Sequence, residues 1–195
     1  MASGDLPQPL IQALADVVAW TSAAGIPVVI VGGVAASLLG RPRLTRDIDA
    51  LVRLPESEWQ NALTRAAEYR FVPRIADAVE FARRSRVLLM KHAPTEIDID
   101  VMLGTLPFEF AAIDNSRATQ IGSLEVRLPR VEDLLIMKAI AHRPRDLLDI
   151  EGLIDAHPKA DLGGVRKWVR EFSIAAAMPE LLEDFDKIVA QRLRK

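Results

Sequence analysis

The stretch at residues 17–40 carries no charged residue and most constrains the fold. A run of about 20 apolar residues is the usual signal for a membrane-spanning helix. Here Gly25, Pro27 and the pair Gly32-Gly33 divide the run into short segments, whereas a spanning helix must satisfy every backbone group within itself. The preceding segment carries Asp16 and no basic residue, so no signal peptide is predicted. We therefore expect a soluble, cytoplasmic protein that does not bind membranes.

Length and composition indicate a globular protein with one domain, or with a core domain and a small helical addition. The chain has 195 residues, 25 Lys+Arg against 27 Asp+Glu, and no cysteine, which excludes disulfides and cysteine-ligated metal sites. Residues 41–91 hold 11 basic and 7 acidic side chains, and residues 92–195 hold 14 and 18. A basic middle segment is weak support for a phosphate-bearing partner, because such patches are commonly solvated surface.

Hydrophobic periodicity predicts an α+β fold with a core at residues 1–130 and a C-terminal helical subdomain at 131–195, packed on the core. Residues 75–86 fit either a helix or an irregular strand. The segments 87–90 and 97–103 form a predicted hairpin around the turn-like residues 92–95. The other expected helices are 8–24, 34–39, 56–70, a short patch ending near 115, 131–142, 145–156, 162–177 and 179–193, and the other strands are 26–31, 48–52, 118–121 and 124–128.

A Gly-Gly pair lies between the predicted strand 26–31 and the helix that follows it. Backbone amides at a helix N-terminus carry partial positive charge, and glycine lets a ligand approach them closely, so Gly32 and Gly33 are candidates for a phosphate cradle. The alternative is a tight turn that uses glycine for its conformational freedom alone.

Two Asp-x-Asp pairs stand on predicted strands. Asp47 and Asp49 begin one strand, and Asp98 and Asp100 alternate with apolar residues on another. If the two strands are neighbours, three or four carboxylates converge, and a bound divalent cation would offset their mutual repulsion. The alternatives are turn capping or pairing with Arg43 or Arg46 for the first pair, and simple alternation on a half-exposed strand for the second.

Other familiar site motifs are absent from the sequence. There is no G-x-G-x-x-G, no G-x-x-x-x-G-K-[ST] and no G-x-S-x-G, which counts against a dinucleotide fold, a P-loop and a serine hydrolase. His92, His142 and His157 lack paired-ligand spacing, so we expect them in loops or at helix ends and predict no zinc site.

The order of these parts resembles the DNA polymerase beta-like nucleotidyltransferase superfamily. Val31-Gly32-Gly33 is followed after thirteen residues by Asp47-Ile48-Asp49, and later by an apolar-flanked aspartate at 98 or 100. The stretch 131–150, with Lys138 and the segment Arg143-Pro-Arg-Asp146-Leu-Leu-Asp149, resembles the helical motifs of AbiEii-type toxins and their minimal, antibiotic-nucleotidyltransferase-like relatives. The fold implied is a nucleotidyltransferase-type mixed β-sheet flanked by helices.

The resemblance also implies roles for individual residues. Gly32 and Gly33 would hold nucleotide phosphates, although many members have serine where this chain has Gly33. Asp47 and Asp49 would bind Mg²⁺ or Mn²⁺, together with a third carboxylate that acts as ligand or general base. Asp100 is favoured for this position, because Asp100 to Gly104 resembles a toxin motif, and Asp98 is the alternate.

The helical motifs would complete the site. Lys138 would contact nucleotide phosphate, and Asp146, or else Asp149, would complete the helical wall. Arg41, Arg43 and Arg46 could receive the triphosphate or the acceptor, with surface pairing to Asp47, Glu56 or Glu58 as the alternative.

The function implied is transfer of NMP from an NTP, such as ATP, to a hydroxyl of tRNA, a protein or a small molecule, by the toxin of a toxin-antitoxin pair with an antitoxin partner. Two alternatives remain open at this stage. One is a non-catalytic nucleotide- or partner-binding protein on the same fold. The other is a structural α+β domain whose acidic strands are surface features. The acceptor, the preferred base and the oligomeric state do not follow from the sequence.

Overall fold

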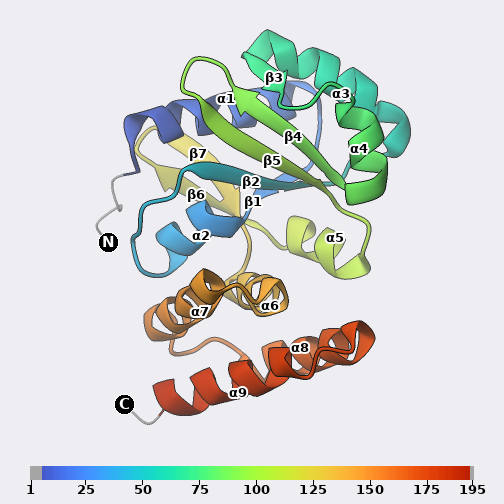
Figure 1. The fold of residues 1–195 in the computed structure, drawn as a ribbon. Helices are drawn as coiled ribbons and strands as arrows, with labels where there is room; N and C mark the ends of the chain where they lie inside the picture. Colours follow the sequence, from blue (N-terminus) through green and yellow to red (C-terminus); the bar gives the residue numbers. More distant parts are fainter. Residues whose placement is uncertain (1–5, 194–195) are drawn as a thin grey trace. The chain divides into compact units, whose positions relative to one another are not determined.

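Short strands and helices alternate along the first two thirds of the chain, and helices alone follow (Figure 1). A computed structural model describes residues 6–193. The helices are α1 (Gln8–Ala23), α2 (Gly32–Leu39), α3 (Trp59–Ala66), α4 (Ala78–Ser85), α5 (Pro107–Asp114), α6 (Val131–Ala141), α7 (Pro144–Ala156), α8 (Leu162–Ala176) and α9 (Glu180–Arg192). The strands are β1 (Val28–Ile30), β2 (Asp47–Val52), β3 (Phe71–Pro73), β4 (Val87–His92), β5 (Ile97–Leu103), β6 (Arg117–Ile121) and β7 (Leu124–Leu128), and single 3-10 turns flank α3 at Glu56–Glu58 and Ala67–Tyr69.

The main sheet has five strands in the order β1-β2-β5-β4-β3. Only the β2–β5 pair is parallel, and the other three pairs are antiparallel, so the sheet is mixed. Strands β6 and β7 form a separate hairpin. This arrangement confirms the predicted fold class, including the 87–103 hairpin.

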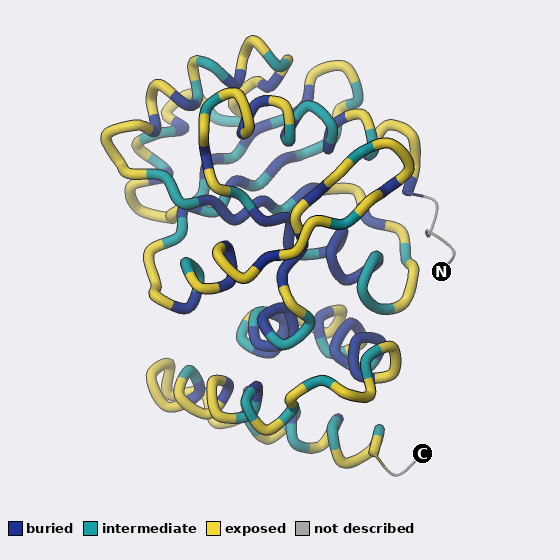
Figure 2. The backbone as a smooth tube through the Cα atoms, turned by 180° about the vertical axis from the view of Figure 1, so that it is seen from behind, coloured by how far each residue is buried: buried dark blue, intermediate teal, exposed yellow. Residues whose placement is uncertain are grey.

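The two faces of the main sheet differ in chemistry. Ile48 and Ala50 on β2 and Ile99 and Val101 on β5 share one face and are fully buried, since successive side chains on a strand point to opposite faces. On this face Trp20 of α1 contacts the Phe71 ring, with centroids 5.9 Å apart. Figure 2 shows buried segments along the central strands and also in the C-terminal helices. The opposite face carries the four aspartates of the two Asp-x-Asp pairs.

Contacts divide the chain into two compact units. The core unit comprises the residues up to Val34 together with Leu44–Leu128. The helical unit comprises Ala35–Arg43 and the residues from Pro129 onward, so helix α2 begins in the former and ends in the latter. The proposed division into a core at 1–130 and a subdomain at 131–195 stays a prediction. Within residues 6–193, no helix is long and apolar enough to cross a membrane.

Three local features either differ from the sequence prediction or decide a point that the sequence left open. Residues 78–85 are helical, which decides the ambiguous segment, and β3 was not anticipated because a three-residue edge strand has too little periodicity to detect. His142 and His157 cap α6 and α7 as expected, but His92 is the last residue of β4 and fully buried. Alternation along β4 places it on the face of Leu88 and Met90, where its Nε2 bonds Asp16 at 2.7 Å.

Candidate active site

The acidic row comprises Asp47 and Asp49 on β2 with Asp98 and Asp100 on β5. Parallel pairing sets Asp47 beside Asp98, and Asp49 beside Asp100. The strands are therefore direct neighbours in matched register. Convergence of the carboxylates, as considered from the sequence, requires such neighbours. Asp47 is exposed and accepts a hydrogen bond of 2.9 Å from the Thr45 hydroxyl, whereas the other three are half-buried.

Gly32 brings the start of α2 against this row. Its φ of +59° is a left-handed conformation that L side chains rarely adopt, and a Cβ built there would lie 1.7 Å from Asp49 Oδ2. No side chain other than hydrogen fits this position. The Val31 backbone N–H donates to the Asp49 carbonyl at 2.9 Å, which anchors the turn to β2. The predicted turn is thus present, but both glycines lie within the first turn of α2.

Arg74 is a member of the site that the sequence did not reveal. Its Nη1 donates to Asp98 Oδ2 at 2.7 Å, and its Nη2 pairs with Asp100 Oδ1. Burial raises the pKa of Asp100, and the charges of Asp47 and Asp98 raise it further, while Arg74 opposes the rise. The pKa of Asp100 lies above its ordinary value as a result.

The acidic row has the donor chemistry that a hard divalent cation requires. Mg²⁺ and Mn²⁺ prefer carboxylate oxygens, and Asp98 Oδ1 is buried without a hydrogen-bond partner. Among residues 6–193, no three His, Asp or Glu side chains lie close enough together to hold a metal ion. In this arrangement Arg74 pairs with two of the four aspartates of the row. The residues of the row fit a divalent metal by type and register. The ligand set of Asp47, Asp49 and Asp100, with Asp98 as the alternate, stays a prediction.

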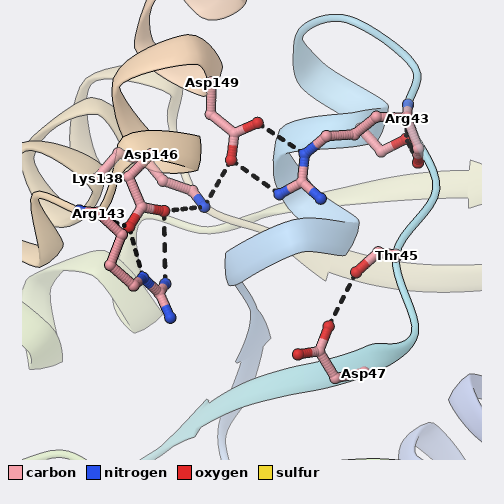
Figure 3. Close-up of polar contacts among 8 residues, drawn as sticks. Arg43, Thr45, Asp47, Lys138, Arg143, Asp146 and Asp149 are labelled. Atoms are coloured by element: carbon pink, nitrogen blue, oxygen red, sulfur yellow. Dashed lines mark hydrogen bonds and ion pairs between the residues drawn. The ribbon is translucent and has the colours of Figure 1, made fainter.

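A second charged cluster lies in the helical unit, around Lys138 (Figure 3). Lys138 Nζ, on a side chain only 4% exposed, contacts Asp146 at 2.7 Å and Asp149 at 2.8 Å. Arg143 also bonds Asp146, and Arg43 bonds both oxygens of Asp149, at 2.7 and 2.9 Å. Lys138 therefore has two buried carboxylate partners, and its contact with nucleotide phosphate stays a prediction.

Electrostatics in this cluster favour charged carboxylates. Burial raises the pKa of Asp146 and Asp149, but hydrogen bonds from the neighbouring arginine and from Lys138 outweigh burial and leave both pKa values below the ordinary value. The cluster joins α6 and α7 to the segment that follows α2.

The three arginines before the acidic row have different surroundings. Arg43 bonds Asp149, and Arg41 pairs with Asp155, whereas the alternative considered from the sequence was surface pairing with Asp47, Glu56 or Glu58. Arg46 is exposed, and its side chain makes no hydrogen bond or ion pair within residues 6–193. Of the three, Arg46 is the guanidinium most open to a phosphate group.

Comparison with known protein families identifies the family of this chain. Residues 12–193 match the family described as "Nucleotidyl transferase AbiEii toxin, Type IV TA system". The chain belongs to this AbiEii family. The resemblance drawn from the Gly-Gly, Asp-x-Asp and helical motifs is confirmed. No curated protein sequence gives a significant match.

Solved structures of nucleotidyltransferases share the fold of this AbiEii-family chain. The solution structure of the antibiotic-resistance factor ANT(2'')-Ia is 15% identical, with a TM-score of 0.58 over 88% of this chain and 95% of that one. A nucleotidyltransferase-like protein of Paracoccidioides brasiliensis is 14% identical, with a TM-score of 0.54 over 93% and 94%. The lincosamide antibiotic adenylyltransferase LnuA, in its lincomycin-bound crystal structure, is 13% identical, with a TM-score of 0.53 over 78% and 99%.

Proposed function

We propose that this AbiEii-family protein is a Mg²⁺- or Mn²⁺-dependent nucleotidyltransferase that moves NMP from an NTP to a hydroxyl acceptor. The single observation that carries the proposal is the in-register pairing of two Asp-x-Asp strands beside a position that admits only glycine at the start of α2. The family and the shared fold support the same reaction class.

The reaction forms a bond between the acceptor oxygen and the α-phosphorus and breaks the bond from that phosphorus to the β-phosphate oxygen, releasing pyrophosphate. Bound divalent metal would supply charge stabilisation for the attacking and leaving oxygens. Asp47, Asp49 and Asp100 would hold it. The backbone at Gly32 and Gly33 would bind phosphate oxygens at the N-terminus of α2, where the helix dipole favours negative charge.

Asp100 is also suited to receive the acceptor proton. This role is the alternative to holding the metal, because a bound divalent cation would favour the charged carboxylate and oppose the rise that burial and two acidic neighbours give the pKa of Asp100. Arg46 would bind the triphosphate from the exposed loop before β2. The family resemblance assigns Lys138 to nucleotide phosphate and Asp146 to the helical wall, and both roles are part of this proposal.

The experiment is label transfer from each of the four radiolabelled NTPs, with Mg²⁺ or Mn²⁺, to cellular RNA, to protein and to small hydroxyl compounds. We expect transfer that Asp49→Asn abolishes. Asp114→Asn, a matched change at an aspartate 60% exposed and paired with Arg53, should retain it. Absence of nucleotide binding and of transfer with every NTP and acceptor would overturn the proposal.

Toxin activity is the second part of the proposal. The family description supports a role as the toxin of a toxin-antitoxin pair. We propose that the protein acts in the cytoplasm, with a protein antitoxin as partner. Expression of the wild type should arrest growth and that of Asp49→Asn should not. Equal growth of the two strains would contradict a toxin role that depends on catalysis.

A non-catalytic nucleotide-binding protein on the same fold is the alternative function. The ion pairs of Arg74 with Asp98 and Asp100 favour it, since both carboxylates already have a cation as partner. Calorimetry separates the two functions, because nucleotide binding without transfer to any acceptor supports the alternative.

A further inference from the structure

We propose that Arg74 is a built-in counter-cation that competes with divalent metal for Asp98 and Asp100, so that full metal loading requires this arginine to leave the acidic row. The inference rests on the proposed function, because it assumes that metal binds there. It goes beyond that function because it makes a residue of this chain, Arg74, limit how much metal the site binds.

The position of Arg74 allows it to bind the row and to leave it. The residue follows β3, the edge strand, and its backbone N–H donates to the Leu89 carbonyl of β4 at 3.0 Å. Its side chain extends past β4, and its guanidinium meets the carboxylates of β5. The side chain is 24% exposed, so the guanidinium can swing into solvent while the backbone stays anchored to β4.

Arg74 satisfies the carboxylates incompletely. Its own Nε and the Asp98 Oδ1 atom are both buried without a hydrogen-bond partner. A buried polar atom left unpaired is unfavourable, and this arrangement holds one on each side of the ion pair. A cation that takes several oxygen ligands at once can engage more of these carboxylate oxygens than the guanidinium does.

The surrounding charges make the competition electrostatic. Lys91 lies opposite Asp98 in the β4–β5 register, but its ammonium pairs with Glu96 at 3.2 Å. Arg74 therefore brings one positive charge to the two carboxylates with which it pairs. Removal of that charge leaves Asp98 and Asp100 without this counter-cation, which lowers the stability of the metal-free protein and increases its attraction for a divalent cation.

Mn²⁺ binding without nucleotide, measured by calorimetry on the full chain, tests the competition. The apparent affinity for Mn²⁺ is the intrinsic affinity multiplied by the fraction of molecules whose site is open. If Arg74 occupies the row about 90% of the time, that fraction is about one tenth, and Arg74→Gln should tighten Mn²⁺ binding about tenfold. Arg84→Gln removes the same charge from an exposed side chain that has no bond within residues 6–193, and it should change the affinity by less than about twofold.

Thermal unfolding provides a readout that does not depend on activity. Arg74→Gln should melt below the wild type in EDTA and gain more from Mn²⁺ than the wild type does. Arg74→Lys retains the charge but lacks the planar guanidinium fork that pairs with both carboxylates, so its melting temperature should fall between those of the wild type and Arg74→Gln. It serves as the folded variant if Arg74→Gln is unstable.

The outcomes separate this inference from the proposed function. If the wild type binds Mn²⁺, Asp49→Asn abolishes that binding, and neither variant of Arg74 tightens it, the competition is refuted and the metal site stands. If none of the proteins binds Mn²⁺, with or without NTP, both are refuted. Tightening in Arg74→Gln that Arg84→Gln reproduces in full would assign the effect to net charge and would also refute the competition.

Discussion

Replacement of Lys138 by methionine tests whether the buried cluster of the helical unit stabilises the fold. The ammonium lies between two carboxylates on side chains only 2% and 6% exposed. Methionine has a similar length but no charge, so the change leaves the volume nearly filled and removes the shared cation. The two aspartates keep their arginine partners, Arg143 and Arg43.

The magnitude follows from the burial of the pairs. Removal of one partner from a buried ion pair costs about 3–5 kcal/mol, and the remaining arginines place this case near the lower end, about 3 kcal/mol. For a chain of this size each kcal/mol lowers the melting temperature by about 2–4 °C, so we expect a loss of about 6–12 °C at pH 7. Calorimetric melting of Lys138→Met beside Lys167→Met, an exposed lysine on α8, measures it.

The loss should also depend on pH in a defined direction. Folding lowers the pKa values of Asp146 and Asp149, so their contribution is present above the unfolded pKa of about 3.9 and disappears as the pH falls through the lower folded values. The wild type should therefore lose more stability than the variant on acidification, and the gap between them should narrow below about pH 4. A gap of less than about 2 °C at pH 7, or one that widens in acid, would refute the reasoning.

Two further variants have matched controls within the chain. Gly32→Ala should lose nucleotide binding and stability, because it combines strain at positive φ with a Cβ 1.7 Å from Asp49. The control Gly25→Ala also has positive φ but meets open space, so it should cost only the strain, about 1–2 kcal/mol. Equal losses for the two variants in melting and nucleotide-titration experiments would contradict this. Asp161→Ala should lower the free energy of chemical unfolding by about 1 kcal/mol, because the Asp161 side chain accepts a hydrogen bond from a backbone N–H at the start of α8. Asp77→Ala should lower it by less, since Asp77 makes no side-chain cap bond on α4.

Most elements could be predicted from local patterns. Helices with a regular apolar stripe and strands with clear alternation lie where expected, because their periodicity is set by the backbone and is visible within one segment. Features that depend on strand pairing were missed. Strand β3 has only three residues, and His92 owes its burial to strand register and to Asp16, far away along the chain.

The candidate site shows the same division. The Gly-Gly turn and the Asp-x-Asp pairs are recognisable as short motifs, since the residues of each motif are adjacent in the chain. Arg74 has no such motif, because it meets Asp98 and Asp100 only through the pairing of β3, β4 and β5. Arg43 likewise reaches Asp149 across more than a hundred residues.

The sequence by itself determined the fold class, the family and the chemical types of the candidate site, because these depend on residue identity, periodicity and order. Only the tertiary structure decided that the two acidic strands are parallel neighbours in matched register, that Asp49 packs against Gly32, and that Arg74 neutralises part of the row. The physical reason is that charges interact through space, and the distances between residues remote in sequence are set by strand pairing and packing.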